Sequence, residues 1–154
     1  MICRRKRHSL AWSLLFATAP MAFASSEGKR VPPDPTYVSE CGSCHVPYPP
    51  RMLPSESWKI LLGGLGKHFD VDASLDEAAL NAVSNFVLNN ARRASSKEIT
   101  PPTRITTSRW FLHEHDEISE AVWKQIKSKA KCEACHTNAQ QGRFSEHELK
   151  LPKP

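Results

Sequence analysis

The feature that most constrains this chain is a five-residue pattern that occurs twice. The two copies are Cys41-Gly42-Ser43-Cys44-His45 and Cys132-Glu133-Ala134-Cys135-His136. Two thiols separated by two residues can form thioethers with both vinyl groups of one haem, and the adjacent histidine then lies where it can ligate the iron. Each motif therefore predicts one covalently attached haem c. The expected proximal iron ligands are His45 and His136.

The first 24 residues are typical of a signal peptide. A basic segment, residues 4–7, precedes a mostly apolar stretch at residues 10–19, and Ala22-Phe23-Ala24 forms a small-residue cleavage site. The apolar stretch is well short of the roughly 20 residues needed to span a bilayer, so we expect no membrane span. The pattern predicts export and a periplasmic location.

Removing this leader changes the charge of the chain. The full sequence has 21 Lys and Arg against 16 Asp and Glu, a formal net charge of +5. The leader holds four of the basic residues and no acidic one, which leaves 17 against 16, or +1. A nearly neutral mature chain gives no support for nucleic-acid binding. Cys3 also leaves with the leader, so the mature chain has four cysteines, all within the two motifs.

Other uses of these four cysteines fit less well. Cys44 and Cys132 lie 88 positions apart, whereas zinc-ribbon sites space their cysteine pairs by roughly 15–20 residues. Paired cysteines in exported proteins often form disulfides, but neither zinc nor disulfides would explain a histidine after both pairs. A thioredoxin-like redox motif would need a βαβ setting that the sequence does not indicate.

The rest of the sequence predicts a mostly α fold with little or no sheet, in which helices and proline-rich loops pack around two haems. We expect a flexible arm at residues 25–36, a first haem region at 37–100, a second haem region at 101–144 and a tail at 145–154. The charged segment from residue 142 onward is expected to be loosely held. Few large apolar side chains are available for a core, so haem would add much of the apolar surface.

Three helices are expected. The first begins at Pro54-Ser55 with Ser55 as N-cap, and places Trp58, Leu61, Leu65 and His68 on one face despite glycines at 63, 64 and 66. The second opens with a capping box at residues 74–77, runs to about residue 93 and carries an apolar stripe. The third runs from about residue 117 to 131 and leads directly into the second motif.

The sixth iron ligands decide what such a protein can do, since an open position binds small molecules and two protein ligands make an electron carrier. Candidates are His68, His113, His115, His147 and Met52. His68 follows the apolar helix face, so we predict it as a distal ligand. His113 and His115 face differently in a helix, and we choose His115. The nearest pairing in sequence is His45 with His68 and His136 with His115, although a crossed pairing is also open.

Basic side chains suggest further contacts. Arg51, Arg104 and Arg109 could pair with haem propionates, or could simply be solvated. Four lysines, at positions 124, 127, 129 and 131, precede the second motif and could dock an acidic redox partner.

The order of motifs resembles the bacterial dihaem cytochrome c family. The resemblance covers about residues 37–144 and rests on Glu40-Cys41-Gly42-Ser43-Cys44-His45, Tyr48-Pro49-Pro50, Ser57-Trp58, His68-Phe69, Asp72-Ala73-Ser74-Leu75-Asp76, Pro102-Thr103-Arg104-Ile105-Thr106, Trp110-Phe111, His115 and Cys132-Glu133-Ala134-Cys135-His136. It implies two bis-histidine haems with His68 and His115 as distal ligands. It also implies periplasmic electron transfer, low-potential haems and a redox protein partner, since members of the family pair with sphaeroides haem protein. The expected partner is a protein of that kind or a membrane cytochrome b.

Two functions follow from these expectations. The first is an electron carrier without enzymatic activity. The second is a haem enzyme or ligand sensor with one displaceable axial ligand, in which the cluster at residues 113–115 supplies acid–base groups.

Overall fold

The computed structural model describes residues 31–95 and 102–152 of the chain. The predicted signal peptide, residues 25–30 of the predicted arm, residues 96–101 at the boundary of the two predicted haem regions and residues 153–154 of the predicted tail lie outside these ranges. Within these ranges the chain forms five α-helices, α1 (Pro35–Cys41), α2 (Ser55–Gly63), α3 (Glu77–Asn90), α4 (Arg109–Glu114) and α5 (Glu120–Ile126). Short 3-10 turns lie at Pro50–Met52, Leu65–Lys67, Ile105–Thr107, Cys132–Ala134, Ala139–Gln141 and Glu146–Glu148.

The described part of the chain contains isolated β-bridges but no strand, which confirms the prediction of a mostly α fold. Within the same residues, no helix is long and apolar enough to cross a membrane.

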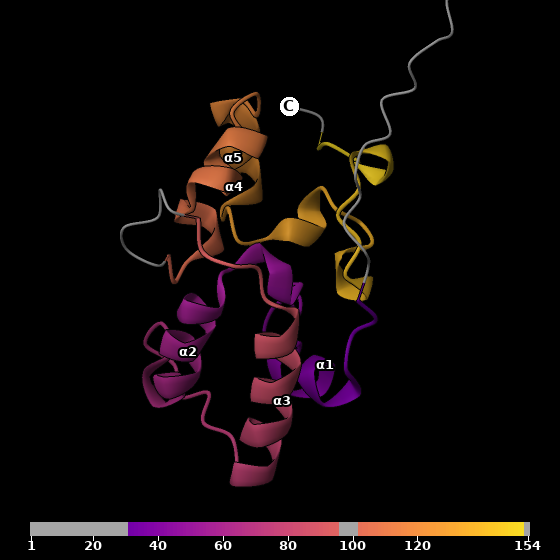
Figure 1. Cartoon of the computed structure of the whole chain (residues 1–154). Helices are drawn as coiled ribbons and strands as arrows, with labels where there is room; N and C mark the ends of the chain where they lie inside the picture. The colour runs from indigo at the N-terminus through magenta and orange to yellow at the C-terminus, as the bar shows by residue number, and fades with distance from the viewer. Residues whose placement is uncertain (1–30, 96–101, 153–154) are drawn as a thin grey trace, which may run out of the picture. The chain divides into compact units, whose positions relative to one another are not determined.

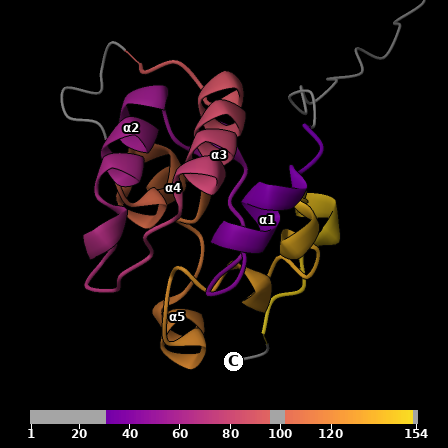
Figure 2. The ribbon, with the colours of Figure 1, turned by 90° about the horizontal axis from the view of Figure 1, so that it is seen from below.

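One hydrophobic core joins both predicted haem regions. Helix α3 packs against α1 and α2, as Figures 1 and 2 both show. The buried members come from α1, from α2 and the loop before it, from α3, and from α4 and the 3-10 turn before it. They are Tyr37, Leu53, Trp58, Val83, Val87, Ile105 and Phe111. Residues from both predicted haem regions therefore depend on the same apolar contacts.

Helix α1 was not predicted from the sequence. Asp34 caps its N-terminus by accepting a hydrogen bond from the Tyr37 amide, and Pro35 stands at the first helical position, where a missing N–H costs nothing. The helix ends at Gly42, where a Cβ would clash with the backbone carbonyl of Val38. Cys41, the first thiol of the first motif, is thus the last residue of a capped helix.

Helix α2 is shorter than predicted. Its N-cap is Pro54, and Ser55 is the first helical residue rather than a capping side chain. The helix ends at Gly63, and a 3-10 turn at Leu65–Lys67 then leads to His68. The expectation that His68 continues one helix face was therefore wrong, because the three closely spaced glycines end the helix instead of lying within it.

The other two predicted helices also have different ends. Asp76, not Ser74, caps α3 through the amide of Ala79, and the predicted stripe is confirmed by the full burial of Val83 and Val87. Helix α5 starts after Ser119 and ends at Lys127, which has a left-handed backbone with φ of 65°. It does not run directly into the second motif.

Ser108 positions α4, the helix that leads to His115. Its buried hydroxyl accepts from the Phe111 amide at 3.1 Å and donates to the Ile105 carbonyl at 2.8 Å. We predict that Ser108→Ala lowers the free energy of unfolding by about 1–2 kcal/mol. Denaturant unfolding followed by circular dichroism would measure this change.

Ser55→Ala is the matched control. The Ser55 side chain makes no capping bond, so its loss should leave stability within about 0.5 kcal/mol of the wild type. An effect equal to that of Ser108→Ala would contradict the assigned caps.

Candidate functional site

The first motif and His68 form one cluster, which we call the first site (Cys41, Cys44, His45 and His68). Cys41 ends α1, Cys44 and His45 follow in the turn after it, and His68 comes directly after the 3-10 turn at Leu65–Lys67. The imidazole rings of His45 and His68 face each other with centroids 6.4 Å apart and planes inclined by 35°.

The second motif and His115 form the second site (Cys132, Cys135, His136 and His115). His115 is the C-cap of α4, and the motif begins in the 3-10 turn at Cys132–Ala134. The rings of His115 and His136 have centroids 6.2 Å apart and planes inclined by 67°. Of the candidate histidines, the structure thus brings one to each motif, in the pairing that is nearest in sequence.

These separations have a chemical meaning. An imidazole nitrogen binds a transition metal at about 2.0 Å, so two imidazoles on opposite sides of one metal have ring centroids about 6.3 Å apart. The observed values of 6.4 and 6.2 Å match this spacing. Rings that only pack together can have similar separations, as His115 and Trp123 do at 6.1 Å. It is the spacing together with the adjacent cysteine pair that points to one haem at each site.

Hydrogen bonds orient one histidine of each pair. The Nδ1 atom of His45 lies 2.8 Å from the Val46 carbonyl, and that of His115 lies 2.9 Å from the Phe111 carbonyl. A carbonyl only accepts, so Nδ1 carries the proton and Nε2 keeps its lone pair for a metal. The His115 ring also stacks on Phe111 with centroids 4.1 Å apart.

Burial shifts the pKa of a histidine and a cysteine at each site. Burial, together with the facing imidazole, lowers the pKa of both His68 and His136, which favours the neutral, metal-binding form. Burial and the neighbouring glutamates Glu40 and Glu133 raise the pKa of Cys41 and of Cys132 to about 11. Neither thiol therefore has the lowered pKa that is typical of a nucleophilic cysteine.

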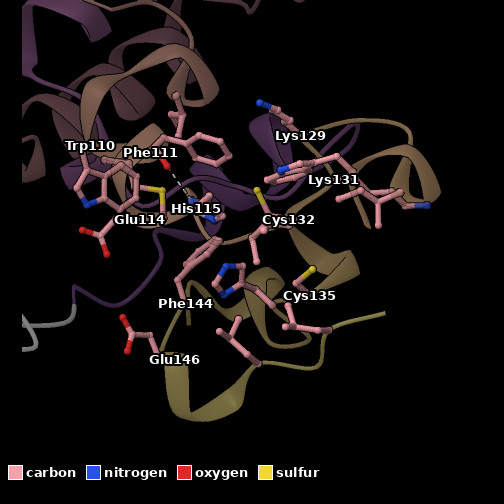
Figure 3. A pocket seen from close by; sticks show the side chains of 18 residues that line it. Trp110, Phe111, Glu114, His115, Lys129, Lys131, Cys132, Cys135, Phe144 and Glu146 are labelled. Atoms are coloured by element: carbon pink, nitrogen blue, oxygen red, sulfur yellow. Dashed lines mark hydrogen bonds between the residues drawn. The ribbon is translucent and has the colours of Figure 1, made fainter. Parts of the chain in front are cut away.

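A pocket with mostly apolar walls surrounds the second site, and Figure 3 shows His115, Cys132 and Cys135 around it. Trp110, Phe111 and Phe144 contribute aromatic walls, while Glu114, Glu146, Lys129 and Lys131 supply charged groups. An apolar cavity with both thiols and both imidazoles on its walls fits a haem, whose ring is apolar and whose edge must reach the cysteines.

The tail is part of this pocket. Leu149 and Leu151 line it, the Lys150 amide donates to the Cys135 carbonyl at 3.0 Å, and Leu149 forms a β-bridge with His136. The expectation of a loosely held tail was therefore wrong for the residues up to 152. The many charged residues of the tail suggested an exposed segment. Leu149 and Leu151, which alternate with polar residues, were the sequence signal for its packing against the pocket.

Of the remaining candidate ligands, the two histidines are exposed and only Met52 lies at a site. His113 is exposed over 82% of its side chain and lies 3.9 Å from the Asp116 carboxylate, and His147 is exposed as well. Met52 lines the pocket of the second site although it follows the first motif in sequence. Sequence spacing gave no indication of that position.

Tyr48 links the surroundings of the two sites. Its ring stacks on His45 with centroids 4.7 Å apart and an interplanar angle of 23°. Its hydroxyl donates a long, 3.4 Å hydrogen bond to the Ala130 carbonyl. Burial, with the nearby Cys132 and Glu133, raises the pKa of Tyr48 to about 12, so the hydroxyl stays protonated.

His68 is followed by a strained turn. Phe69 and Asp70 both have positive φ, 51° and 71°, and the Val71 amide donates to the His68 carbonyl at 3.1 Å. This is the pattern of a type I′ turn, which normally contains asparagine and glycine. The Arg104 guanidinium lies 3.9 Å from the centroid of the Phe69 ring, and Phe69 packs edge-on against His68. These contacts offset part of the strain.

Comparison with known proteins identifies the family. The family model for dihaem cytochrome c matches residues 37–144. The chain belongs to the dihaem cytochrome c family. Its cofactors are two haem c groups, and the family is one of electron carriers. Among the curated proteins, none matched this chain.

Solved structures of other dihaem cytochromes have the same fold. A crystal structure of the protein from Rhodobacter sphaeroides is 40% identical, with a TM-score of 0.65, and the alignment covers 75% of this chain and all of that one. A second structure from Rhodobacter sphaeroides is 37% identical, with a TM-score of 0.67 and coverage of 72% and 96%. The cytochrome from Shewanella baltica OS155 is 31% identical, with a TM-score of 0.66 and coverage of 79% and 95%.

The tail of this dihaem cytochrome provides a test of the pocket. We predict that deleting residues 149–154 lowers the reduction potential of one of the two haems, because water that enters the opened pocket stabilises the more highly charged ferric form. A spectroelectrochemical titration that resolves both haems would measure the shift.

Deleting residues 153–154 alone is the control, since it leaves Leu149, Lys150 and Leu151 in place. It should leave both potentials unchanged. If the longer deletion also changed neither potential, the tail would not shield the second site.

Proposed function

We propose that this protein is a periplasmic dihaem cytochrome c that passes electrons between redox partners through two bis-histidine haems. In this proposal one haem is attached through Cys41 and Cys44 and the other through Cys132 and Cys135. His45 and His136 are the proximal iron ligands. His68 and His115 are the distal ones, paired with His45 and His136 respectively.

The observation that supports this assignment best is the opposed imidazole pair at each site. The centroid separations of 6.4 and 6.2 Å leave room for one metal ion between the rings, and both pairs adjoin a Cys-x-x-Cys pair. Haem iron supplies reversible one-electron exchange when it is bound. The chain's part is to fix the imidazoles, through the Val46 and Phe111 carbonyls, and to limit access of water.

Two protein ligands on each iron favour a carrier over an enzyme. Substrates and small ligands need a vacant or weakly held axial position, and the proposed ligand sets offer none. His113 and Glu114, which could have served as acid–base groups, have exposed side chains, and His113 lies near Asp116. The geometry therefore gives the alternative of a haem enzyme or ligand sensor no specific support.

The proposed location rests on the sequence of residues 1–24. A basic segment, a short apolar stretch and an Ala-x-Ala site favour export through a cleaved signal peptide. Covalent attachment through thioethers suits an exported protein, because the cofactor cannot be lost by dissociation.

Replacing either distal histidine tests the ligand assignment. We predict that His68→Ala and His115→Ala each convert one haem from six-coordinate low spin to high spin and allow it to bind carbon monoxide, while the second haem stays unchanged. Visible absorption and electron paramagnetic resonance spectra would count the haems affected. The double variant should convert both.

His113→Ala and His147→Ala are the matched controls, since both side chains are exposed. Their spectra should remain fully low spin. A wild-type protein with a high-spin fraction, or an unaltered spectrum in His68→Ala or His115→Ala, would refute the ligand set and revive the sensor alternative.

The proposed partner is a redox protein with an acidic docking surface, such as a haem protein of the sphaeroides type or a membrane cytochrome b. Lys129 and Lys131 are exposed and lie at the pocket of the second site, with the Lys129 ammonium 5.2 Å from the centroid of the Trp123 ring. Lys124 is instead paired with Glu120 at 3.2 Å. Lys129 and Lys131 therefore lie where an acidic partner protein could approach the edge of the second haem.

Charge reversal tests this docking role. We predict that Lys129→Glu combined with Lys131→Glu slows oxidation by anionic ferricyanide and speeds reduction by cationic hexaammineruthenium at low ionic strength. Both differences should shrink with added salt, because screening removes exposed-charge effects. Stopped-flow absorbance would measure the rates. Lys59→Glu, on the exposed side of α2, should have a smaller effect, and equal effects would argue against a localised docking surface.

A further inference from the structure

Tyr48 contacts groups from both haem sites, which lie far apart in the sequence. Its ring stacks on His45, the predicted proximal ligand of the first site. Its hydroxyl reaches the Ala130 carbonyl, 82 positions further along the chain and two residues before Cys132. One side chain therefore spans from an axial ligand of one haem to the attachment segment of the other.

The contact at Ala130 leads directly to the second site. The Cys132 sulfur also lies near the Ala130 carbonyl, at 3.6 Å. The thiol proton that makes this a hydrogen bond is lost when a thioether forms, but the proximity of the sulfur to the carbonyl does not depend on that proton. A continuous series of contacts thus connects the His45 ring, the Tyr48 ring and hydroxyl, the Ala130 carbonyl and the Cys132 sulfur.

The position of Tyr48 is fixed by its surroundings. Pro47, Pro49 and Pro50 restrict the backbone on both sides of it and are buried. The buried Tyr37 side chain donates a hydrogen bond of 2.6 Å to the Tyr48 carbonyl. A surface tyrosine that only filled space between loops would not need this degree of backbone restraint.

We propose that Tyr48 couples the two haems electronically. Its ring stack on His45 and its hydrogen bond to Ala130 provide a route from His45 to the segment that carries Cys132. The inference rests on the proposed function, in which electrons move between the two haems. In each event one ferrous iron loses one electron and the ferric iron of the other haem gains it. Tyr48 is not itself oxidised and keeps its proton. Electronic coupling decays more slowly through bonds and close contacts than through empty space, so the route sets the rate.

Two substitutions separate the ring from the hydroxyl. Tyr48→Phe keeps the stack on His45 and loses the bond to Ala130, and Tyr48→Leu loses both. Flash photoreduction of the half-oxidised holoprotein, followed by the absorbance changes of re-equilibration, would give the exchange rate between the haems. Intramolecular exchange is independent of protein concentration, which distinguishes it from exchange between molecules.

We expect Tyr48→Phe to slow this exchange several-fold and Tyr48→Leu to slow it by a further several-fold. The larger effect belongs to the ring because the hydroxyl bond is long, at 3.4 Å. Both reduction potentials and the low-spin spectrum should stay as in the wild type, since the iron ligands are untouched. These two readouts would move if Tyr48 only held His45 in place.

Thr107→Val is the matched control, because it removes one exposed hydroxyl–carbonyl hydrogen bond, to Arg104, that is not part of the route. Its exchange rate should equal that of the wild type. Equal rates in the wild type and both Tyr48 variants would overturn the proposal, as would slowing that is accompanied by shifted potentials or matched by Thr107→Val. If Tyr48→Leu fails to fold, Tyr48→Phe and Thr107→Val alone still decide it. A wild type without concentration-independent exchange would instead refute the proposed function.

Discussion

The spacing between facing imidazoles is the constraint on which the rest of this structure depends. Two pairs of histidines stand 6.2 and 6.4 Å apart between ring centroids, and elements from most of the described chain serve to hold them there. Helix α1 ends at the first thiol, the turn after α2 carries His68, and the capped helix α4 ends at His115. Helices α1 and α4 are short and end at or next to a site residue, whereas α3, with 14 residues, supplies core contacts instead. A haem provides apolar surface that longer helices would otherwise have to supply.

Much of the site could be predicted from residue type and order. The Cys-x-x-Cys-His spacing predicts the two haems of the family, and the sequence predicts that His68 and His115, of five candidates, lie beside the motifs. The helix face expected for His68 is wrong, because α2 stops at Gly63 and a turn brings the histidine to His45. The sequence alone does not show whether the glycines at 63, 64 and 66 lie within the helix or end it. The structure shows that they end it and that His68 lies in the turn that follows, next to His45.

Other features could not be predicted because they depend on contacts between distant residues. Met52 lies at the second site although it follows the first motif, and the tail closes the same pocket through Leu149 and Leu151. Helix α1 escaped prediction because it is short and its core-facing side is represented mainly by Tyr37. Helix caps were displaced by one or two residues, from Ser55 to Pro54 and from Ser74 to Asp76, since several neighbouring residues could serve and packing makes the choice.

The two sites differ in how much of the chain each one needs. The thiols and imidazoles of the first site all fall between residues 41 and 68, whereas the pocket of the second draws residues from Met52 to Leu151. A chain that is synthesised from its N-terminus therefore contains every residue of the first site before the last walls of the second site's pocket exist. Because chains generally begin to fold from the N-terminal side during synthesis, the segments before residue 95 can order first and provide the surface on which the later segments settle.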